Sequence, residues 1–489
     1  MLSLASRPVW LCLGATLLAV SATSATAGVN QLPDEGDCPT VSGRSNIDEN
    51  GVARDVAAVT LKEGMLIGIE DLLILRDLVP AEIWRHREAF FYEGMQMEIG
   101  PCHRRYPTPS FFQEATAKFS KDVELTKAGD LKNYTAGVPF PPEGIDLEDN
   151  NAAQRWAWNL EQRFRGGGHQ GHFRVVDFPT RIGQAQSYEG RFYLLPTSAR
   201  SDLAKTNYQL PDAEKSWWIA GGHFSKPFSV RHIAWRQFRP LDALTDYEKP
   251  DNTFIYVPAM RKSRRAATAW VDGMYFPTYT QADQEGGGPL AFGGDMGSIN
   301  PTSSRSAAVS ANAYRGFEGL ALRPNAYAWR VNGTTDVLAP INSATQGFPI
   351  TEDRNFGPAG LSVAGDRWEP RHAIVIEGAT RVVEEAIRTV TYYVDAQTTT
   401  PLYRITRAGR RRLLDIQIFV HRFSGDVESY PEWPGGRPAL VFDPVAQVSY
   451  NAAAGGGGWR RESYDIVSLP FTDDDLVGLL SAASLERGH

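Results

Sequence analysis

The fold is decided by residues 366–423, whose larger part, residues 388–423, reads RTVTYYVDAQTTTPLYRITRAGRRRLLDIQIFVHRF. Arg388–Val394 is rich in β-branched and aromatic residues, which predicts a strand. The next six residues, DAQTTT, have turn composition, and Pro401 opens a second short strand. The chain turns again at Ala-Gly-Arg before a third strand begins. Together with an apolar run at Ala373–Glu377, these segments predict an antiparallel β-meander.

The last strand of this stretch, Leu413–Phe423, alternates in polarity. Leu414, Ile416, Ile418 and Val420 fall on one face, whereas Asp415, Gln417, Phe419 and His421 fall on the other. Because successive side chains of a strand point to opposite faces, one face should meet a core and the other water or a groove. A long antiparallel sheet with one apolar face needs another layer packed against it.

The hairpin YYVDAQTTTPLYRI (392–405) resembles the tyrosine-strand, Asp-turn, Pro-Leu-strand hairpin of LolA/LolB-like half-barrels. Four stretches resemble the DUF1329 family of proteobacterial periplasmic proteins, and their order and spacing carry the likeness. They are GVPFPPEGIDLEDNNAAQRW (137–156), FIYVPAMRKSRRA (254–266), YRGFEGLALRPNAYAWRVNGTTDVLAPIN (314–342) and RWEPRHAIVIEG followed by TVTYYVDAQT (367–398). The resemblance implies a mainly β fold with helices (α+β). In such a fold a curved antiparallel half-barrel sheet wraps over helices, with a helical segment at the N-terminus.

The N-terminus has the pattern of a cleaved secretory signal peptide over residues 1–27. Arg7 is its only charge, Val9–Val20 is its apolar core, and Ala25-Thr26-Ala27 fits an A-x-A cleavage site. The core is shorter than the ~20 residues that span a bilayer. We therefore expect a periplasmic protein of a Gram-negative bacterium. Residues 28–170 should form a largely helical extension, and residues 171–489 should form the LolA-like half-barrel domain.

The charge of the chain argues against nucleic acid as a partner. The net charge is −7, and removal of Arg7 with the signal peptide makes it −8. A nucleic-acid-binding domain usually carries a basic excess.

Two cysteines, Cys38 and Cys102, remain after cleavage of the signal peptide. An even pair in an oxidising compartment usually forms a disulfide, so we predict a Cys38–Cys102 bond. Two unpaired thiols are the alternative. A metal site is less favoured, because His103 is the only other soft ligand nearby.

Four stretches have helical spacing of apolar residues: Leu61–Glu93, which Pro80 divides, Phe111–Leu131, Leu147–Arg165 and Thr472–Ser484. From about Phe173 onward strand patterns dominate, without the alternation of strands and helices that a parallel sheet requires. The Gly/Ser-rich segment Gln281–Arg305 is predicted to be a mobile loop near the mouth of a groove.

No catalytic motif is present, and we predict no catalytic residue, metal or cofactor. His169 and His172 lie in GGGHQGHF, which lacks the helix and the glutamate of H-E-x-x-H, so a solvated loop is favoured over a metal site. There is no G-x-S-x-G elbow, no P-loop and no dinucleotide fingerprint.

The predicted ligand-binding residues are basic and aromatic: Arg261, Arg264, Arg265, Tyr392, Tyr393 and Tyr403. The basic run RKSRR (261–265) follows a strand, where it is either a solvated hairpin tip or a cationic rim for an acidic partner or a lipid head group. Arg410–Arg412 is a second basic turn. The tyrosines could supply amphipathic walls to a groove.

The favoured function is that of a non-enzymatic periplasmic carrier for a hydrophobic ligand, such as a lipid, an acyl chain or a small molecule, or for a lipidated protein. The resemblance implies traffic between the inner and outer membranes, with an inner-membrane transporter and an outer-membrane protein as candidate partners. Two alternatives stay open. A flat apolar patch would favour an outer-membrane assembly protein, and perturbed carboxylates or histidines in a pocket would favour a hydrolase of lipids or glycans.

Overall fold

The computed structural model describes residues 32–41, 44–47, 53–56, 58–178, 186–258, 261–266, 273–276, 317–342, 363–382, 387–452, 458–480 and 484–485. The predicted signal peptide and the predicted mobile loop Gln281–Arg305 lie outside these residues. No helix in the described part is both long enough and apolar enough to cross a membrane.

One sheet of 15 strands dominates the molecule. Its first meander consists of β9 (His169–Phe178), β10 (Gln186–Pro196), β11 (Ser216–Lys226), β12 (Ala234–Pro240), β13 (Asn252–Val257) and β14 (Lys262–Ala266). Its second consists of β15 (Tyr327–Pro340), β16 (Arg367–Thr380), β17 (Thr389–Asp395), β18 (Pro401–Arg407), β19 (Leu413–Phe423), β20 (Phe442–Asn451) and β21 (Gly458–Val467). β21 pairs with β9 and so joins the two meanders.

The predicted meander of residues 366–423 is confirmed. β16, β17, β18 and β19 pair antiparallel in sequence order, with Ile376 opposite Tyr392 and Tyr403 opposite Ile418. Two short N-terminal strands extend the sheet beyond β16, where β6 (Met97–Ile99) pairs parallel with β16 and β5 (Leu66–Ile67) pairs antiparallel with β6. The remaining short strands form separate two-stranded pairs: β1 (Thr40–Val41) with β4 (Val59–Thr60), β2 (Arg44–Ile47) with β3 (Ala53–Val56), and β7 (Glu124–Leu125) with β8 (Leu131–Lys132).

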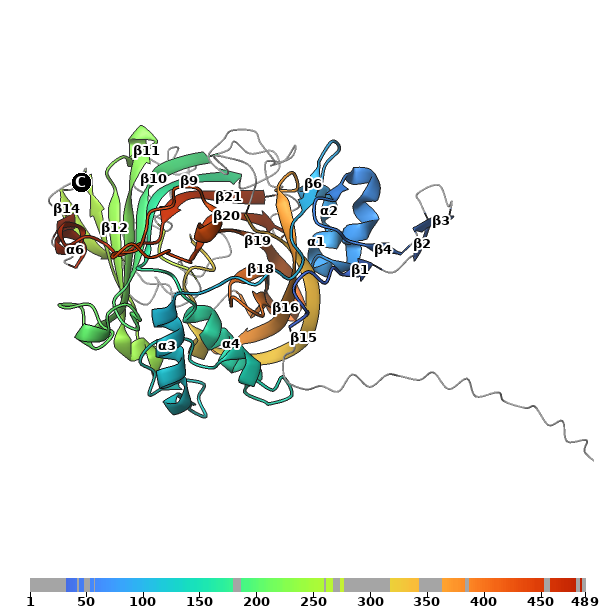
Figure 1. The fold of residues 1–489 in the computed structure, drawn as a ribbon. Helices are drawn as coiled ribbons and strands as arrows, with labels where there is room; N and C mark the ends of the chain where they lie inside the picture. Colours follow the sequence, from blue (N-terminus) through green and yellow to red (C-terminus); the bar gives the residue numbers. More distant parts are fainter. Residues whose placement is uncertain are drawn as a thin grey trace, which may run out of the picture.

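Helices cover both faces of the second meander. The sheet curves, and α3 (Ser110–Phe119) and α4 (Ala152–Glu161) lie in its open side, whereas α1 (Ala81–Arg85) and α2 (Arg87–Phe90) lie outside β16 (Figure 1). The last helix, α6 (Asp473–Leu479), begins with a capping box formed by Thr472 and Asp475. The predicted architecture, a mainly β half-barrel over helices, is therefore confirmed.

Short 3₁₀ segments complete the described elements: η1 (Ile69–Asp77), η2 (Ser120–Asp122), η3 (Pro142–Gly144), η4 (Ala204–Thr206), η5 (Phe228–Val230), η6 (Leu241–Leu244), η9 (Pro324–Ala326), η10 (Gly409–Arg411) and η11 (Ser424–Asp426). The predicted helical stretch Leu61–Glu93 is thus η1 followed by α1 and α2, with Pro80 between them. Each of the other predicted helices exists but is shorter than its apolar pattern.

The alternation of β19 has a different outcome from the one expected. Ile416 and Ile418 pack with η1, α1 and α2 in one core, as predicted. On the other face, however, Phe419 is 4% exposed and packs with α4, and Gln417 is 2% exposed. Most side chains on both faces of this strand are buried, because the N-terminal helices cover the outer face and α4 covers the inner one.

Candidate functional site

A cleft of about 400 Å³ opens between α3 and the turn that joins β17 to β18. Its walls come from segments that are far apart in the sequence: Tyr106–Thr108, α3, the connector 138–143, Phe164, the turn 397–400, and Leu440 with Phe442. This volume lies within the roughly 300–1,000 Å³ typical of small-molecule sites.

The connector is held against α3 by a close backbone approach. Gly137 has a φ of +84°, and a Cβ there would lie 2.5 Å from the backbone nitrogen of Thr116. The hydroxyl of Thr116 accepts a hydrogen bond from the Val138 backbone at 2.9 Å. Glycine is therefore needed at 137, because any side chain would push the connector away from α3 and change the width of the cleft.

The helix α4 fixes the same connector from the other side. The Asn159 side chain accepts from the Phe140 nitrogen at 3.1 Å and donates to its carbonyl oxygen at 2.5 Å. Asn159 is fully buried, so these bonds are made away from competing water. The wall of the cleft is thus tied to the core of the molecule.

The floor of the cleft is the turn that the sequence singled out. The Asp395 carboxylate accepts from the backbone nitrogens of Gln397 and Thr398 at 2.9 and 2.7 Å. It also forms a buried ion pair with Arg371 of β16, whose Nε lies 2.6 Å away. Burial alone would raise the pKa of Asp395, but Arg371 and the backbone donors outweigh it and lower that pKa below its usual range.

Tyr106 connects the floor to the N-terminal part of the chain. Its backbone nitrogen and carbonyl form two hydrogen bonds with the Gln397 side chain, at 3.2 and 2.9 Å. Its hydroxyl donates to Glu369 at 2.6 Å, and burial raises the pKa of this carboxyl. Its ring packs edge-on against Phe442, 4.8 Å between centroids. Tyr106 is therefore pinned at both its backbone and its side chain.

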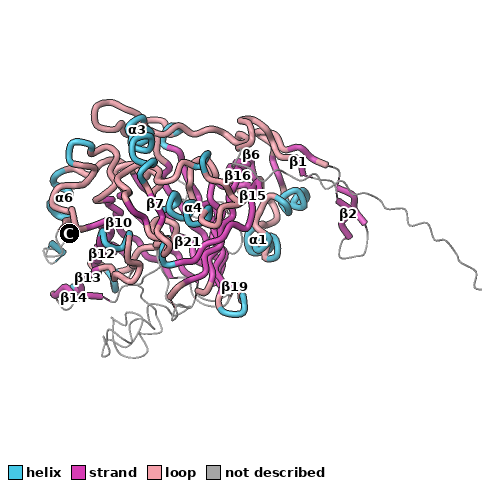
Figure 2. Tube along the Cα trace, turned by 90° about the horizontal axis from the view of Figure 1, so that it is seen from below, coloured by secondary structure: helices cyan, strands magenta, loops and turns pink. Residues whose placement is uncertain are grey.

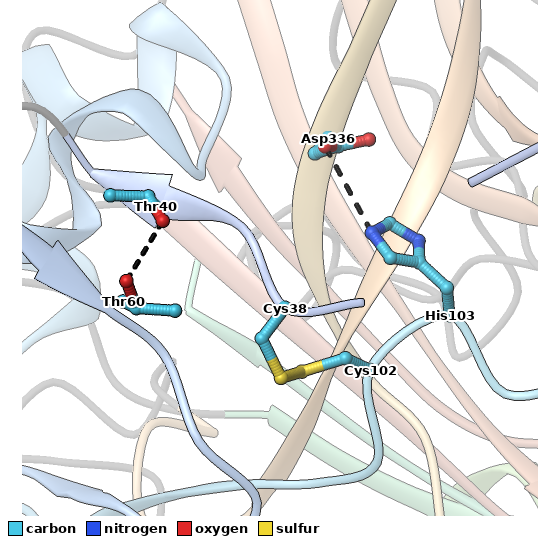
Figure 3. The surroundings of a disulfide bond; sticks show 6 residues. All are labelled: Cys38, Thr40, Thr60, Cys102, His103 and Asp336. Atoms are coloured by element: carbon cyan, nitrogen blue, oxygen red, sulfur yellow. Dashed lines mark hydrogen bonds and ion pairs between the residues drawn. A yellow bond between two sulfur atoms is a disulfide. The ribbon is translucent and has the colours of Figure 1, made fainter. Parts of the chain in front are cut away.

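The disulfide Cys38–Cys102 lies just before this segment, with 5.1 Å between the Cα atoms (Figure 3). The prediction of this bond is confirmed. His103 follows directly, is buried, and lies 3.9 Å from Asp336 of β15, which also accepts from His372 at 2.7 Å. The disulfide thus anchors the N-terminal tail beside the segment that leads to Tyr106.

The lining of the cleft is largely apolar and carries almost no charge. Aromatic, proline and aliphatic side chains alternate with threonine, serine and glutamine, and Glu143, which is exposed, is the one ionisable carboxylate among the described lining residues. Histidine, cysteine and lysine are absent from that lining. Such a surface can bind an apolar molecule and orient it by hydroxyl and amide groups, but it offers little for acid–base or nucleophilic chemistry.

The predicted tyrosines lie on two different faces of the sheet. Tyr392 is fully buried against α4, whereas Tyr403 is fully buried in the outer core, where its hydroxyl donates to the Leu338 carbonyl. Tyr393 is half-buried and packs edge-on against Tyr403, 5.8 Å between ring centroids. The structure does not bring the three tyrosines together in one groove.

The predicted arginines lie far from these tyrosines. Arg261 precedes β14, and Arg264 and Arg265 lie on it; all three are exposed. Arg265 donates to Asn252 at 2.6 Å. In the strand order β14 is a terminal strand, with β13, β12, β11, β10, β9, β21, β20 and β19 between it and β18.

His169 is on β9, not on a solvated loop, and belongs to a buried polar group. Its Nδ1 lies 2.7 Å from the Ser468 hydroxyl, which donates to Asp443 at 2.5 Å. The serine therefore lies between the histidine and the carboxylate, whereas a catalytic triad places the histidine between the other two. All three are at most 1% exposed. Burial raises the pKa of Asp443 to about 6 and lowers that of His169 well below its usual value.

The residues that line the cleft were mostly missed from sequence. The turn after Asp395 and the turn-rich connector were recognised as turns, but nothing in either marked it as a wall of a shared cleft. No sequence pattern around Tyr106 or Phe442 indicated a binding site. The pairing of Tyr106 with Gln397 spans 291 residues, and no local pattern indicates it.

The family model of DUF1329, a protein of unknown function, matches residues 85–283. The resemblance to DUF1329 is confirmed. The matched DUF1329 region includes α3, α4, the connector and the first meander, and therefore one side of the cleft. Two of the four resembling stretches, 137–156 and 254–266, lie within it, and the other two lie beyond it. No curated protein matches the chain.

Solved structures similar to this chain include three bacterial proteins. A domain named for outer membrane lipoprotein sorting, from Vibrio parahaemolyticus, is 12% identical; the match covers 69% of this chain and 100% of that one, with a TM-score of 0.38. A DUF1329 family protein from Desulfovibrio piger is 10% identical over 68% and 96% of the two chains, with a TM-score of 0.38. A LolA superfamily protein from Nitrosomonas europaea is 11% identical over 65% and 92%, with a TM-score of 0.30. These likenesses concern the fold alone.

Proposed function

We propose that this protein is a non-enzymatic periplasmic carrier that holds a hydrophobic ligand in the cleft between α3 and the β17–β18 turn. The observation that carries the proposal is the nearly uncharged, largely apolar lining of a cleft whose walls are pinned by buried polar contacts. An apolar ligand gains roughly 25 cal/mol for each Å² of surface removed from water. Because the walls are already ordered before binding, little of this free energy is offset by the entropic cost of ordering the chain.

The disulfide and the predicted signal peptide support the periplasmic location, since disulfides persist in oxidising compartments. A lipid, an acyl chain or a small hydrophobic molecule all fit the chemistry of the lining. Traffic of such a ligand between the inner and outer membranes, together with a transporter and an outer-membrane protein, is the role that the DUF1329 and LolA resemblance suggests. A lipidated protein would be held by its acyl chain.

The cleft can be tested with the uncharged fluorophore N-phenyl-1-naphthylamine as the apolar probe. Ala117 lies on α3, is exposed and lines the cleft. The larger side chain of Ala117→Trp should fill the cleft and take away apolar surface that the probe would bury. We therefore expect probe binding to weaken by tenfold or more. Glu114 is exposed on the same helix outside the lining, so Glu114→Trp is the matched control and should bind as the wild type does. Unchanged binding by Ala117→Trp would show that the ligand site lies elsewhere.

The alternative function, a hydrolase, can be tested by measuring ester turnover. Glu143 is the carboxylate that a hydrolytic mechanism in this cleft would have to use, because no other ionisable acid lies among its described lining residues. Wild-type protein should not turn over p-nitrophenyl esters of fatty acids. Turnover that is lost in Glu143→Gln would replace the carrier proposal with the enzyme.

A further inference from the structure

The loops at the two ends of the strands differ in charge. In an antiparallel meander, alternate hairpin loops lie at the same end of the strands. The β11–β12, β13–β14 and β18–β19 loops share one end, here called the basic end; the β10–β11, β12–β13, β17–β18 and β19–β20 loops share the other, the cleft end. Figure 2 shows β14 and β19 on one side of the molecule and α3 on the opposite side.

The basic end has an excess of positive charge in its described loops, in β14 and in the last residues of β11 and β18. Segments 226–233, 258–266 and 407–412 together contain ten lysine and arginine residues and no aspartate or glutamate. At the cleft end, loops 197–215, 241–251 and 424–441 contain ten carboxylates and five basic residues. Among these described segments, the excess of positive charge is therefore at the basic end, in a chain whose net charge is −7.

Most of these cations are available to a partner. Within the described part of the chain, ion pairs involve Lys226 with Glu189, Arg407 with Glu82 and Arg411 with Glu377. Arg264, Arg410 and others at this end are exposed and form no ion pair with described residues. These charges therefore contribute little to the stability of the fold.

An apolar side chain projects from the same end. Phe228, in the β11–β12 loop, is 88% exposed, and it stands between Lys226 and Arg231 in the sequence. The other large apolar side chains that are strongly exposed in the described part are Leu66 and Val477. An exposed aromatic residue flanked by cations matches the chemistry of a lipid interface, where the ring enters the head-group region and the cations meet phosphates.

The breadth of the basic end fits a surface better than a pocket. Six strand intervals separate β12 from β19, and at about 4.8 Å each they spread the loops over roughly 30 Å along the sheet. We propose that the basic end, with Phe228 as its apolar anchor, docks the protein on an anionic lipid surface. This surface is distinct from the cleft, so the proposal holds whether or not the cleft carries a hydrophobic ligand.

The test is co-sedimentation with vesicles of phosphatidylcholine alone and of equal parts phosphatidylcholine and phosphatidylglycerol, at low and high salt. Wild-type protein should bind the anionic vesicles, bind the neutral ones at least tenfold more weakly, and lose binding at high salt as screening increases. Arg264→Gln/Arg410→Gln should weaken anionic binding roughly 30-fold, from two basic contacts. Lys205→Gln/Lys215→Gln removes the same charge from exposed positions at the cleft end and should bind as the wild type does.

The apolar anchor has a separate control. Phe228→Ser should weaken binding roughly tenfold, whereas Val477→Ser, at the exposed position on α6, should have no effect. Wild-type protein that does not prefer anionic vesicles would overturn the proposal. So would an equal loss of vesicle binding in Arg264→Gln/Arg410→Gln and in Lys205→Gln/Lys215→Gln. Binding that depends on the arginines but not on Phe228 would overturn the role of Phe228 as the apolar anchor. Urea unfolding of each variant checks that it is folded.

Discussion

The two ends of the sheet use arginine in opposite ways. At the cleft end, Arg371 is buried, pairs with Asp395, and also donates to the Arg104 carbonyl at 2.6 Å. At the basic end, Arg264 and Arg410 are exposed and make no ion pair with described residues. A buried, paired charge fixes a geometry, whereas an exposed, unpaired one remains available to a partner. The same residue type therefore positions a neutral cleft at one end and forms a charged surface at the other.

The largest expected effect is on the cleft end. Arg371→Met leaves the Asp395 carboxylate buried without its partner, which should lower the free energy of unfolding by roughly 3–5 kcal/mol. Arg264→Gln at the basic end should change it by no more than about 0.5 kcal/mol. Urea unfolding at neutral pH measures both. Similar losses in the two variants would mean that the charges at the two ends do not differ in role.

The second-largest expected effect is the loss in the free energy of unfolding when the disulfide is removed. It closes a loop with a sequence separation of 64 residues, so the chain-entropy estimate for Cys38→Ser/Cys102→Ser is a loss of about 4 kcal/mol at most. Reduction of the wild type should reproduce the loss, and the double serine variant should be insensitive to reductant. Titration of the denatured, unreduced wild type should find no free thiol from this pair. A loss below about 1 kcal/mol would show that the tail hardly constrains the segment leading to Tyr106.

The smallest effect concerns a second buried charge near the cleft end, Asp443, which follows Phe442. Its folded-state pKa of about 6 lies above the ordinary value of 3.8, so the folded state binds the proton more tightly between these values. The stability that this group contributes is present at low pH and is lost as the pH rises through about 6. The wild type should therefore gain roughly 1 kcal/mol over Asp443→Asn between pH 7 and pH 5.

The control for this pH dependence is Asp465→Asn, at an exposed position on β21. It should follow the wild type across the same range. If Asp443→Asn also follows the wild type, the carboxyl at 443 does not titrate as its burial implies.

The second meander could be predicted because its signals are local. Strand residues alternate with a period of two, and the Asp395 turn and Pro401 mark the breaks between strands. The cleft could not be predicted in the same way, because it forms where Tyr106, α3, the connector and the turn 397–400 meet. The charges that position it look ordinary in sequence: Arg371 and Asp395 read as two polar residues of neighbouring strands.

The burial of β19 is a second feature that a local sequence pattern does not predict. A period of two indicates that the two faces differ, but it does not indicate what covers each one. The helices that cover the outer face of β19 come from residues 69–90, more than 300 positions earlier in the chain. Gln417, on the inner face, bonds to Arg404 at 2.9 Å and so is satisfied without water. Polarity alone therefore predicted a face that meets water or a groove, whereas the structure has a largely buried, hydrogen-bonded face.

The pairing of β21 with β9 determines when the sheet can close. Trp459 lies opposite Phe178, and among the described strands this is the one pairing that joins the two meanders. A chain that emerges from its N-terminus first presents β9 long before β21, so β9 and β20 each keep an unpaired edge until residues 458–467 arrive. Unpaired edges invite pairing with other chains, and so long a sequence separation slows folding. The half-barrel is thus most exposed to aggregation late in its synthesis, just before its last strand joins the sheet.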